Sequence, residues 1–195
     1  MIYLKYYLSK KSYIEINNNV KMKDSTIQTS TYSLNFGVML GLASVFFSLM
    51  LFFLDTHYQG GTISSTVPLL LSVSFINYGI YEFRKDNNGL ISLSQSLKVG
   101  VGIALISGII GTFYAIILTE ILDPKFMEKT FEIAKQKMLE DNQELSLENA
   151  NQAIEMSKKF ATLPIRIAGG LIGSIFMGFL ISLIGGLILR KTKPE

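Results

Sequence analysis

The sequence contains no cysteine and a single histidine among its 195 residues. The absence of cysteine excludes disulfide frameworks, thiolate chemistry and cysteine-rich zinc sites, and a single histidine excludes a histidine cluster. No basic stripe is interleaved with aromatic side chains, so nothing indicates nucleic-acid binding. The chain also lacks HExxH, GxSxG and phosphate-loop motifs. We therefore expect no enzyme activity, no catalytic residue, no cofactor and no metal site.

What the chain does contain is long apolar runs. Hydrophobic residues make up 49% of the sequence, and its mean hydropathy is +0.36. The apolar residues are bunched into four runs separated by charged segments, and each run is long enough to cross a hydrocarbon layer of about 30 Å. This pattern predicts an all-α integral membrane protein with four transmembrane helices. Residues 33–122 hold the first three spans, near 34–54, 62–83 and 99–118, and residues 164–190 form the fourth.

The last apolar run carries a ridge of small residues. Within PIRIAGGLIGSIFMGFLISLIGGLILR a small side chain recurs at every fourth position, at Gly170, Ser174, Gly178, Ser182 and Gly186. Residues four apart lie on one face of a helix, so this ridge allows another backbone to approach closely. We expect this face to pack against a partner helix.

Smaller sets of the same kind occur in the first and third runs. In the first, Gly37 and Gly41 are four residues apart, as are Ser44 and Ser48. In the third, Gly108 belongs to a series of glycines along the span. Such sets favour close helix packing inside one bundle.

Few polar side chains interrupt the runs, and no ionisable one falls at a span centre. Asn77 is interpreted as a residue that hydrogen-bonds across to another helix, with a substrate contact as the alternative. Glu82 and Lys98 fall at the inner ends of the second and third spans and are interpreted as interfacial anchors. At the outer boundary, Glu120 and Arg166 can pair if spans 3 and 4 are neighbours, with an ion-binding mouth as the alternative.

The turn after the first span holds the only histidine. Asp55 and His57 supply too few ligands for a metal, because a site needs three or four, so we interpret this segment as a solvated turn. Tyr114, in the third span, is interpreted as a packing or interface residue.

Residues 123–163 are the only sizeable water-facing segment. Asp123 followed by Pro124 is typical of a helix start, with aspartate as the N-cap and proline in the first turn. Two sets of apolar residues then predict an extramembrane hairpin of two amphipathic helices between spans 3 and 4. These sets are Met127, Phe131, Ala134 and Met138, followed by Ala153, Met156, Phe160 and Leu163. The apolar seam either closes over the bundle, which the slight negative charge favours, or lies on the membrane.

Lysine and arginine are distributed unevenly between the connections, which predicts orientation. They are frequent in the polar tail of residues 1–32, in residues 84–98 and around the cytoplasmic tail of residues 191–195, but absent from the first turn. The positive-inside tendency then places both termini in the cytoplasm and the hairpin outside. For residues 1–21 two hypotheses are open: translation begins at Met22, or this segment is a disordered tail.

The connection between the second and third spans, GIYEFRKDNNGLISLSQSLKVG, has the most specific pattern in the chain. Within it we expect Ser94 to be the N-cap of the next helix, and Ile91 and Leu93 to lie at the lipid boundary. The pattern consists of Arg84, Asp86, Gly89, Ile91, Ser92, Lys98 and Gly100.

Together with DPKFMEKTFEIAKQKMLE after the third span and ILRKTKPE at the end, this connection resembles the bacterial domain-of-unknown-function family 4199. The resemblance covers residues 32–193. It implies a four-span protein of the inner (cytoplasmic) membrane of Bacteroidota, and it carries over no catalytic residue.

The pattern as a whole favours an interaction or regulatory component of the membrane. Glycine ridges would mediate helix packing, and the hairpin would meet a partner, either another membrane protein or a second copy of this chain, beside the lipid bilayer itself. A small transporter or channel subunit is the alternative. Against it stand the absence of mid-membrane charge, of a broken span and of an inverted repeat. A membrane-embedded enzyme is the least favoured class, because a nucleophile and a base are lacking.

Overall fold

The regular elements of the described chain are all helices. A computed structural model describes residues 28–58, 61–142 and 144–191, so the hypotheses on residues 1–21 and Met22 lie outside these ranges. No β-strand occurs within them. The elements are α2 (Thr29–Phe53), α3 (Thr62–Asp86), α4 (Leu93–Ile117), the π-helix η1 (Leu118–Leu122), α5 (Phe126–Asp141), α6 (Leu147–Phe160) and α7 (Leu163–Leu189).

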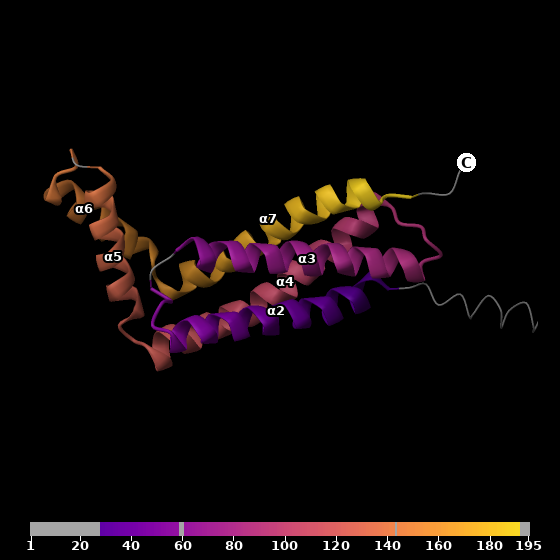
Figure 1. Cartoon of the computed structure of the whole chain (residues 1–195), viewed down its shortest axis with the longest axis horizontal. Helices are drawn as coiled ribbons and strands as arrows, with labels where there is room; N and C mark the ends of the chain where they lie inside the picture. Colours follow the sequence, from indigo (N-terminus) through magenta and orange to yellow (C-terminus); the bar gives the residue numbers. More distant parts are fainter. Residues whose placement is uncertain (1–27, 59–60, 143, 192–195) are drawn as a thin grey trace, which may run out of the picture.

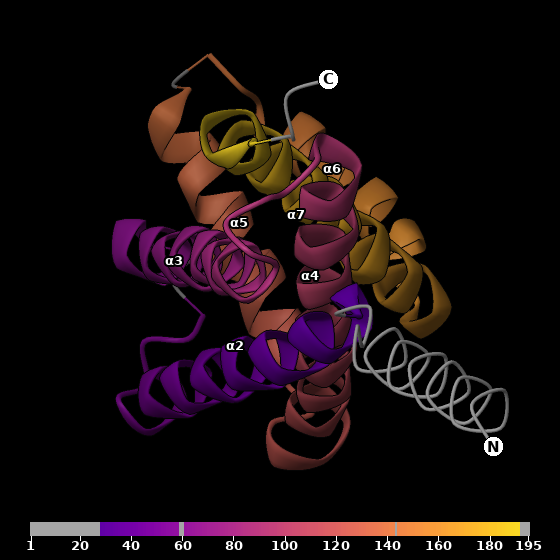
Figure 2. The same cartoon turned by 90° about the vertical axis from the view of Figure 1, so that its right-hand side faces the viewer.

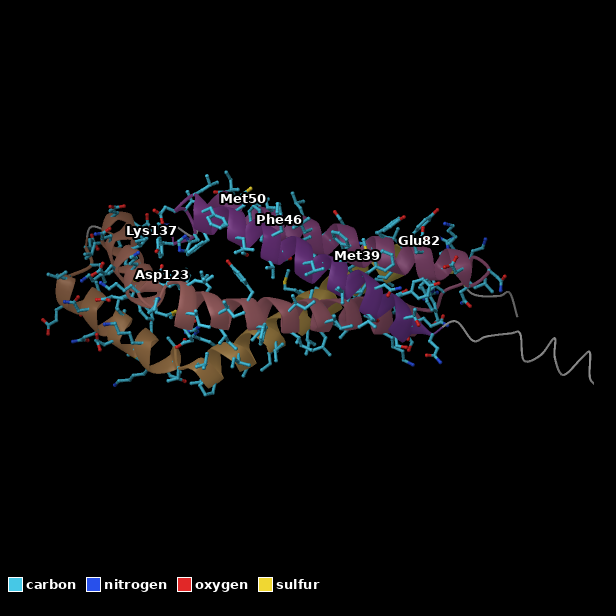
Figure 3. All side chains as sticks on the ribbon, turned by 90° about the horizontal axis from the view of Figure 1, so that it is seen from below. Met39, Phe46, Met50, Glu82, Asp123 and Lys137 are labelled. Atoms are coloured by element: carbon cyan, nitrogen blue, oxygen red, sulfur yellow. The ribbon has the colours of Figure 1, made fainter. Side chains whose placement is uncertain are left out.

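Four of these helices are long and apolar enough to cross a membrane: α2, α3, the continuous α4–η1 and α7. The predicted number of spans is therefore confirmed. Their large apolar side chains are mostly on the outside, with Phe46, Phe113 and Ile188 exposed by 74%, 68% and 76%. Figure 3 shows Phe46 on α2 between two other exposed residues, Met39 and Met50. Lipid accommodates such a surface, whereas soluble monomers rarely expose one of this extent.

The helix α4 is the centre of the bundle. It packs against α2, α3 and α7, and α3 also contacts α2 and α7. Figure 1 shows the ends of the described chain at one end of the bundle and α5 with α6 at the other. We call these the termini end and the α5 end. Figure 2, a view along the bundle, shows α2 and α7 on different sides of α4.

Within the four spans, the best-buried side chains lie toward the termini end. Ile80 and Phe83 near the end of α3 and Val99 and Ile103 near the start of α4 are fully buried. Toward the α5 end the same helices leave a cavity of about 310 Å³ between α2, α3 and α4. The bundle is therefore tightly packed at one end and has an open pocket between its helices at the other.

The α5–α6 pair lies beside the α5 end of the bundle. In the described residues α6 packs against α5 and α5 against η1, and neither helix packs extensively along α2, α3 or α7. In this part of the chain, closure over the bundle is therefore limited to the first turn of α5, where Phe126 stacks on His57. The buried residues of α6 are Ala150 and Ile154, whereas Met156 and Phe160 are exposed by 62% and 65%. The prediction that the face with Met156 and Phe160 is buried was wrong. The helix has a second apolar face, with Ala150 and Ile154, and that face packs against α5.

Candidate functional site

Small residues of α7 face small residues of α4 in one continuous antiparallel register. A Cβ added to Gly178 would overlap that of Ala104, and one added to Gly186 would lie 2.7 Å from the Cβ of Ser96. Each step moves four residues along both helices, in opposite directions. We call this the small-residue ladder; its pairs are Ser96–Gly186, Gly100–Ser182, Ala104–Gly178, Gly108–Ser174 and Thr112–Gly170. The ridge predicted on the last span therefore has α4 as its neighbour.

The ladder loosens toward the α5 end. A Cβ added to Gly170 would lie 3.6 Å from Thr112 Oγ1, an ordinary van der Waals contact. On the other side of α4, isoleucine side chains of α4 pack against the glycines of α2. A Cβ at Gly37 would lie 2.7 Å from the Cβ of Ile106, and one at Gly41 would lie 2.7 Å from Ile110 Cδ1. Of the eight residues predicted to mediate packing, the seven on α2 and α7 thus lie on faces that contact α4, and Gly108 lies on α4 and faces Ser174 of α7.

The turn between α3 and α4 is held by side-chain hydrogen bonds to backbone carbonyls. Arg84 Nε donates to the carbonyl of Gly89 at 3.1 Å, and Asn87 Nδ2 donates to that of Leu90 at 2.8 Å. The backbone reverses through two left-handed residues, Asn88 with φ 56° and Gly89 with φ 75°. Two members of the sequence pattern, Arg84 and Gly89, therefore act together in forming this turn.

The helix α4 begins at a capping box that sequence analysis assigned to the wrong serine. The backbone N–H of Gln95 donates to Ser92 Oγ at 3.2 Å, and that of Ser92 donates to Gln95 Oε1 at 2.9 Å. Ser94 lies inside the first turn, because the S-x-x-Q spacing satisfies two backbone donors from Ser92. Ile91 is buried and forms an antiparallel bridge with Lys191, with N–H···O distances of 2.9 and 3.0 Å. The expectation that it lies at the lipid boundary was wrong.

The substitution Gly89→Ala is expected to lower the free energy of unfolding by about 1 kcal/mol. An L-residue at this positive φ is strained, and no atom lies within 4 Å of the added Cβ, so sterics add nothing. Denaturant titration of the purified protein in detergent measures the change. The control is Gly173→Ala, which has the same open surroundings in a helix and should be neutral or stabilising. Equal stability of the two variants would contradict the strain.

The three polar residues singled out in the second and third spans, Asn77, Glu82 and Lys98, differ in the contacts that they make. Asn77 Nδ2 donates to Val73 O at 2.8 Å within its own helix, and its Oδ1 faces Gly185 of α7. The expected hydrogen bond across helices was wrong, because a glycine offers no side-chain partner. Glu82 pairs with Lys85, with Nζ and Oε2 3.2 Å apart. Lys98 is exposed on α4.

At the α5 end, four side chains meet where the turn after α2 touches the start of α5. The Tyr58 hydroxyl donates to Asp123 Oδ2 and accepts from Lys129 Nζ at 2.6 Å. Lys129 Nζ lies 3.9 Å from the same carboxylate oxygen, and His57 Nε2 lies 3.5 Å from it. We call these four residues the Asp123 cluster; Figure 3 shows Asp123 at the opposite end of the molecule from Glu82.

The Asp123 carboxylate is stabilised in its charged form. The hydrogen bond from the Tyr58 hydroxyl lowers the pKa of Asp123 most, and the charge of Lys129 and the His57 ring lower it further, against partial desolvation. Hydrogen bonding to Tyr58 raises the pKa of Lys129 in turn. The cluster therefore holds the Asp123 carboxylate and the Lys129 ammonium group together through Tyr58, which lies 65 and 71 residues from them in the sequence.

Two predictions about this region were wrong. Asp123 is not the N-cap of α5 but the residue after η1, and its carbonyl accepts from the N–H of Phe126, where α5 begins. His57 is not solvated, because its side chain is only 6% exposed. Its ring stacks on that of Phe126 with centroids 5.7 Å apart. The first turn of α5 therefore covers the histidine, which spacing along the sequence does not indicate.

The segment that contains the ladder, the turn and the Asp123 cluster also matches a known family. Residues 35–191 match the family model described as "Protein of unknown function (DUF4199)". The chain belongs to the DUF4199 family. No curated protein and no solved structure matches it. The family membership that the connection between the second and third spans indicated is confirmed.

Within the DUF4199 segment, Glu120 and Arg166 lie together as the sequence allowed. Arg166 Nη1 is 3.8 Å from Glu120 Oε1, and Arg166 Nη2 donates to Thr119 Oγ1 at 2.7 Å. Thr119 is buried, whereas Glu120 is half exposed, so the hydrogen bond from the charged guanidinium to the Thr119 hydroxyl is better shielded from water than the ion pair with Glu120. Thr119 and Glu120 both belong to η1, which continues α4. Their contacts with Arg166 therefore hold the start of α7 against the end of α4.

Three polar residues of the DUF4199 segment were missed by sequence analysis: Tyr58, Lys129 and Thr119. Each acts through a partner at least 47 residues away, so no local spacing identifies it. The one sequence feature that indicates a role for Tyr58 is its position next to His57, as the only aromatic pair in a short polar turn. No group of three or more His, Cys, Asp or Glu side chains that could hold a metal occurs in the described ranges.

Proposed function

We propose that this DUF4199 chain is a multi-pass protein of a bacterial inner (cytoplasmic) membrane that acts as an interaction or regulatory component and not as an enzyme. The observation that carries the proposal is an open groove of about 510 Å³ between α5 and α6. Both helices contribute to its wall, and neither is committed to packing along the spans. An extramembrane unit of this kind is available to a partner.

The chemistry of the groove fits an amphipathic segment of another protein. Met127 and Phe131 supply apolar surface beside the buried Ile154, and Glu132 and Lys135 are among the charged side chains that also line the groove. An apolar centre with a polar rim is the usual anatomy of a protein-binding surface. We propose a partner that presents an amphipathic helix on the same side of the membrane.

The transporter alternative is not favoured by this arrangement. The glycine ridges of the third and fourth spans could line a narrow path only if they lay apart. The ladder instead brings those ridges together, since Cβ atoms at Gly178 or Gly100 would overlap their neighbours. The interaction reading is therefore the one that we propose.

Orientation is part of the same proposal: the termini end lies in the cytoplasm, and α5 with α6 lies outside. The concentration of lysine and arginine near the termini end supports it. We expect an alkaline phosphatase fusion after residue 60 or 145 to be active and one after residue 90 to be inactive. Activity only after residue 90 would reverse the orientation.

Site-specific photocrosslinking tests the groove. A benzoylphenylalanine at position 131 should give one discrete protein adduct in intact cells, and the same group at Gln136, exposed on α5 outside the groove, should not. Lys135→Glu should abolish the adduct without changing protein accumulation. Lipid adducts alone, identical adducts from both positions, or an adduct that survives Lys135→Glu would each overturn the proposal. An adduct of twice the chain's mass that meets the other criteria would identify the partner as a second copy.

A further inference from the structure

A cavity of about 310 Å³ lies in the half of the bundle nearest the α5 end. Residues of α2, α3, α4 and the first turn of α5 line it, together with His57 from the turn after α2. Its volume is at the lower end of the range for small-molecule sites, and it corresponds to roughly ten water molecules of the liquid. The cavity therefore has room for more than a bridging water.

Two side chains that line this cavity have buried polar atoms without a hydrogen-bond partner. They are the hydroxyl of Tyr114 and the ring nitrogens of His57, whose side chain is only 6% exposed. Buried polar groups in folded proteins are almost always paired, so an orphaned pair beside one cavity indicates that something else supplies the partner. Ser44, Ser48 and Ser64 also line the space.

The orientation of the histidine defines what that partner must offer. His57 Nε2 faces the Asp123 carboxylate at 3.5 Å, which is too long for a good hydrogen bond but favours the proton on that nitrogen. Nδ1 is then left as an acceptor, and the Tyr114 hydroxyl is able to donate. A hydroxyl group meets both requirements, because it donates one hydrogen bond and accepts another.

The rest of the lining defines the body of the ligand. Among the described residues, no aspartate, glutamate, lysine or arginine lines the cavity, and Val45, Leu51, Leu118 and Phe126 give it apolar walls. A charged head group would lose its hydration there without a counter-charge. We propose that this cavity binds an uncharged, lipid-soluble alcohol, with its hydroxyl between His57 Nδ1 and the Tyr114 hydroxyl. This proposal is independent of the partner groove between α5 and α6.

Photolabelling with a long-chain alcohol that carries a diazirine tests the site in the full chain in liposomes. We expect saturable labelling of peptides from residues 44–51 and 111–118, competed by unlabelled decanol but not by its methyl ether, which cannot donate. Tyr114→Phe should reduce the labelling about tenfold. It should leave the unfolding midpoint unchanged or raised, because the removed hydroxyl has no partner in the empty protein.

Three outcomes would overturn the alcohol site. They are equal competition by decanol and its ether, equal labelling of wild type and Tyr114→Phe, and labelling confined to lipid-exposed residues such as Phe46. The variant Ala115→Leu narrows the same cavity without touching either polar group, and it should also reduce labelling. If Tyr114→Phe lowers the unfolding midpoint, its hydroxyl has an intramolecular partner, and the proposal fails on that ground alone.

Discussion

Gly178→Leu is expected to lower the free energy of unfolding by about 3 kcal/mol or more and to reduce accumulation of the protein in the membrane. Even a Cβ at this position would overlap the Cβ of Ala104, and the carbonyl oxygen of Gly100 would lie 3.3 Å away. A leucine must therefore push α7 off α4 along the best-packed part of their contact. Unfolding of the purified protein in detergent by increasing SDS measures the loss.

The matched control is Gly173→Leu on the same helix. No atom lies within 4 Å of a Cβ added there, so the leucine gains only lipid contact and stability should stay within about 0.5 kcal/mol of wild type. A second check uses smaller substitutions. Gly178→Ala should lower the free energy of unfolding. The double variant Gly178→Ala with Ala104→Gly should recover part of that loss, because removing the Ala104 methyl group makes room for the new one. Equal behaviour of the two leucine variants would mean that the ladder is not a packing interface.

The sequence was sufficient to predict the spans but not their neighbours. Length and hydropathy identify four helices because a membrane imposes both. The four-residue spacing of Gly178, Ser182 and Gly186 identifies the face that packs, yet periodicity says nothing about which helix meets it. The partner ridge on α4 includes Ser96 and Thr112, which are small but polar, so a search for glycines overlooks them.

Predictions from local sequence were wrong where the same residues were compatible with two structures. Ser92 and Ser94 both precede the apolar run, and only the glutamine three residues after Ser92 separates them. In α6 two apolar faces compete, and the face of Ile154 packs on α5 while that of Phe160 stays exposed. The first choice is therefore decided by a local capping box, and only the second by a tertiary contact.

The Asp123 cluster shows the limit for functional residues. The contact between Tyr58 and Asp123 joins residues 65 apart, and it depends on how η1 ends and how the turn after α2 folds. Neither feature has a sequence signature strong enough to predict it. The burial of His57 follows from the same geometry, so the alcohol site was likewise invisible before the fold was known.

Asp123→Asn is expected to lower the free energy of unfolding at neutral pH by about 2 kcal/mol, within the range for hydrogen bonds to charged groups. The amide keeps an acceptor for the Tyr58 hydroxyl but removes the charge that attracts Lys129 and faces His57. Denaturant titration in detergent at pH 7 gives the difference. Asp55→Asn is the control, because Asp55 is an exposed acid in the neighbouring turn that attracts Lys129 without a hydrogen bond to Tyr58, and it should have a clearly smaller effect.

The wild-type protein and Asp123→Asn should also differ in how their free energy of unfolding depends on pH. Because the pKa of Asp123 is lowered in the folded protein, its contribution is fully present above the usual aspartate pKa of about 3.9. As the pH falls below that value, the unfolded chain takes up the proton first, so the contribution is lost through the folded-state pKa. Asp123→Asn has no such contribution to lose, so the stabilities of wild type and variant should converge over the interval from about pH 5 down to the lowered pKa of Asp123. A constant difference over that interval would show that the Tyr58 hydroxyl and Lys129 do not stabilise the charged carboxylate.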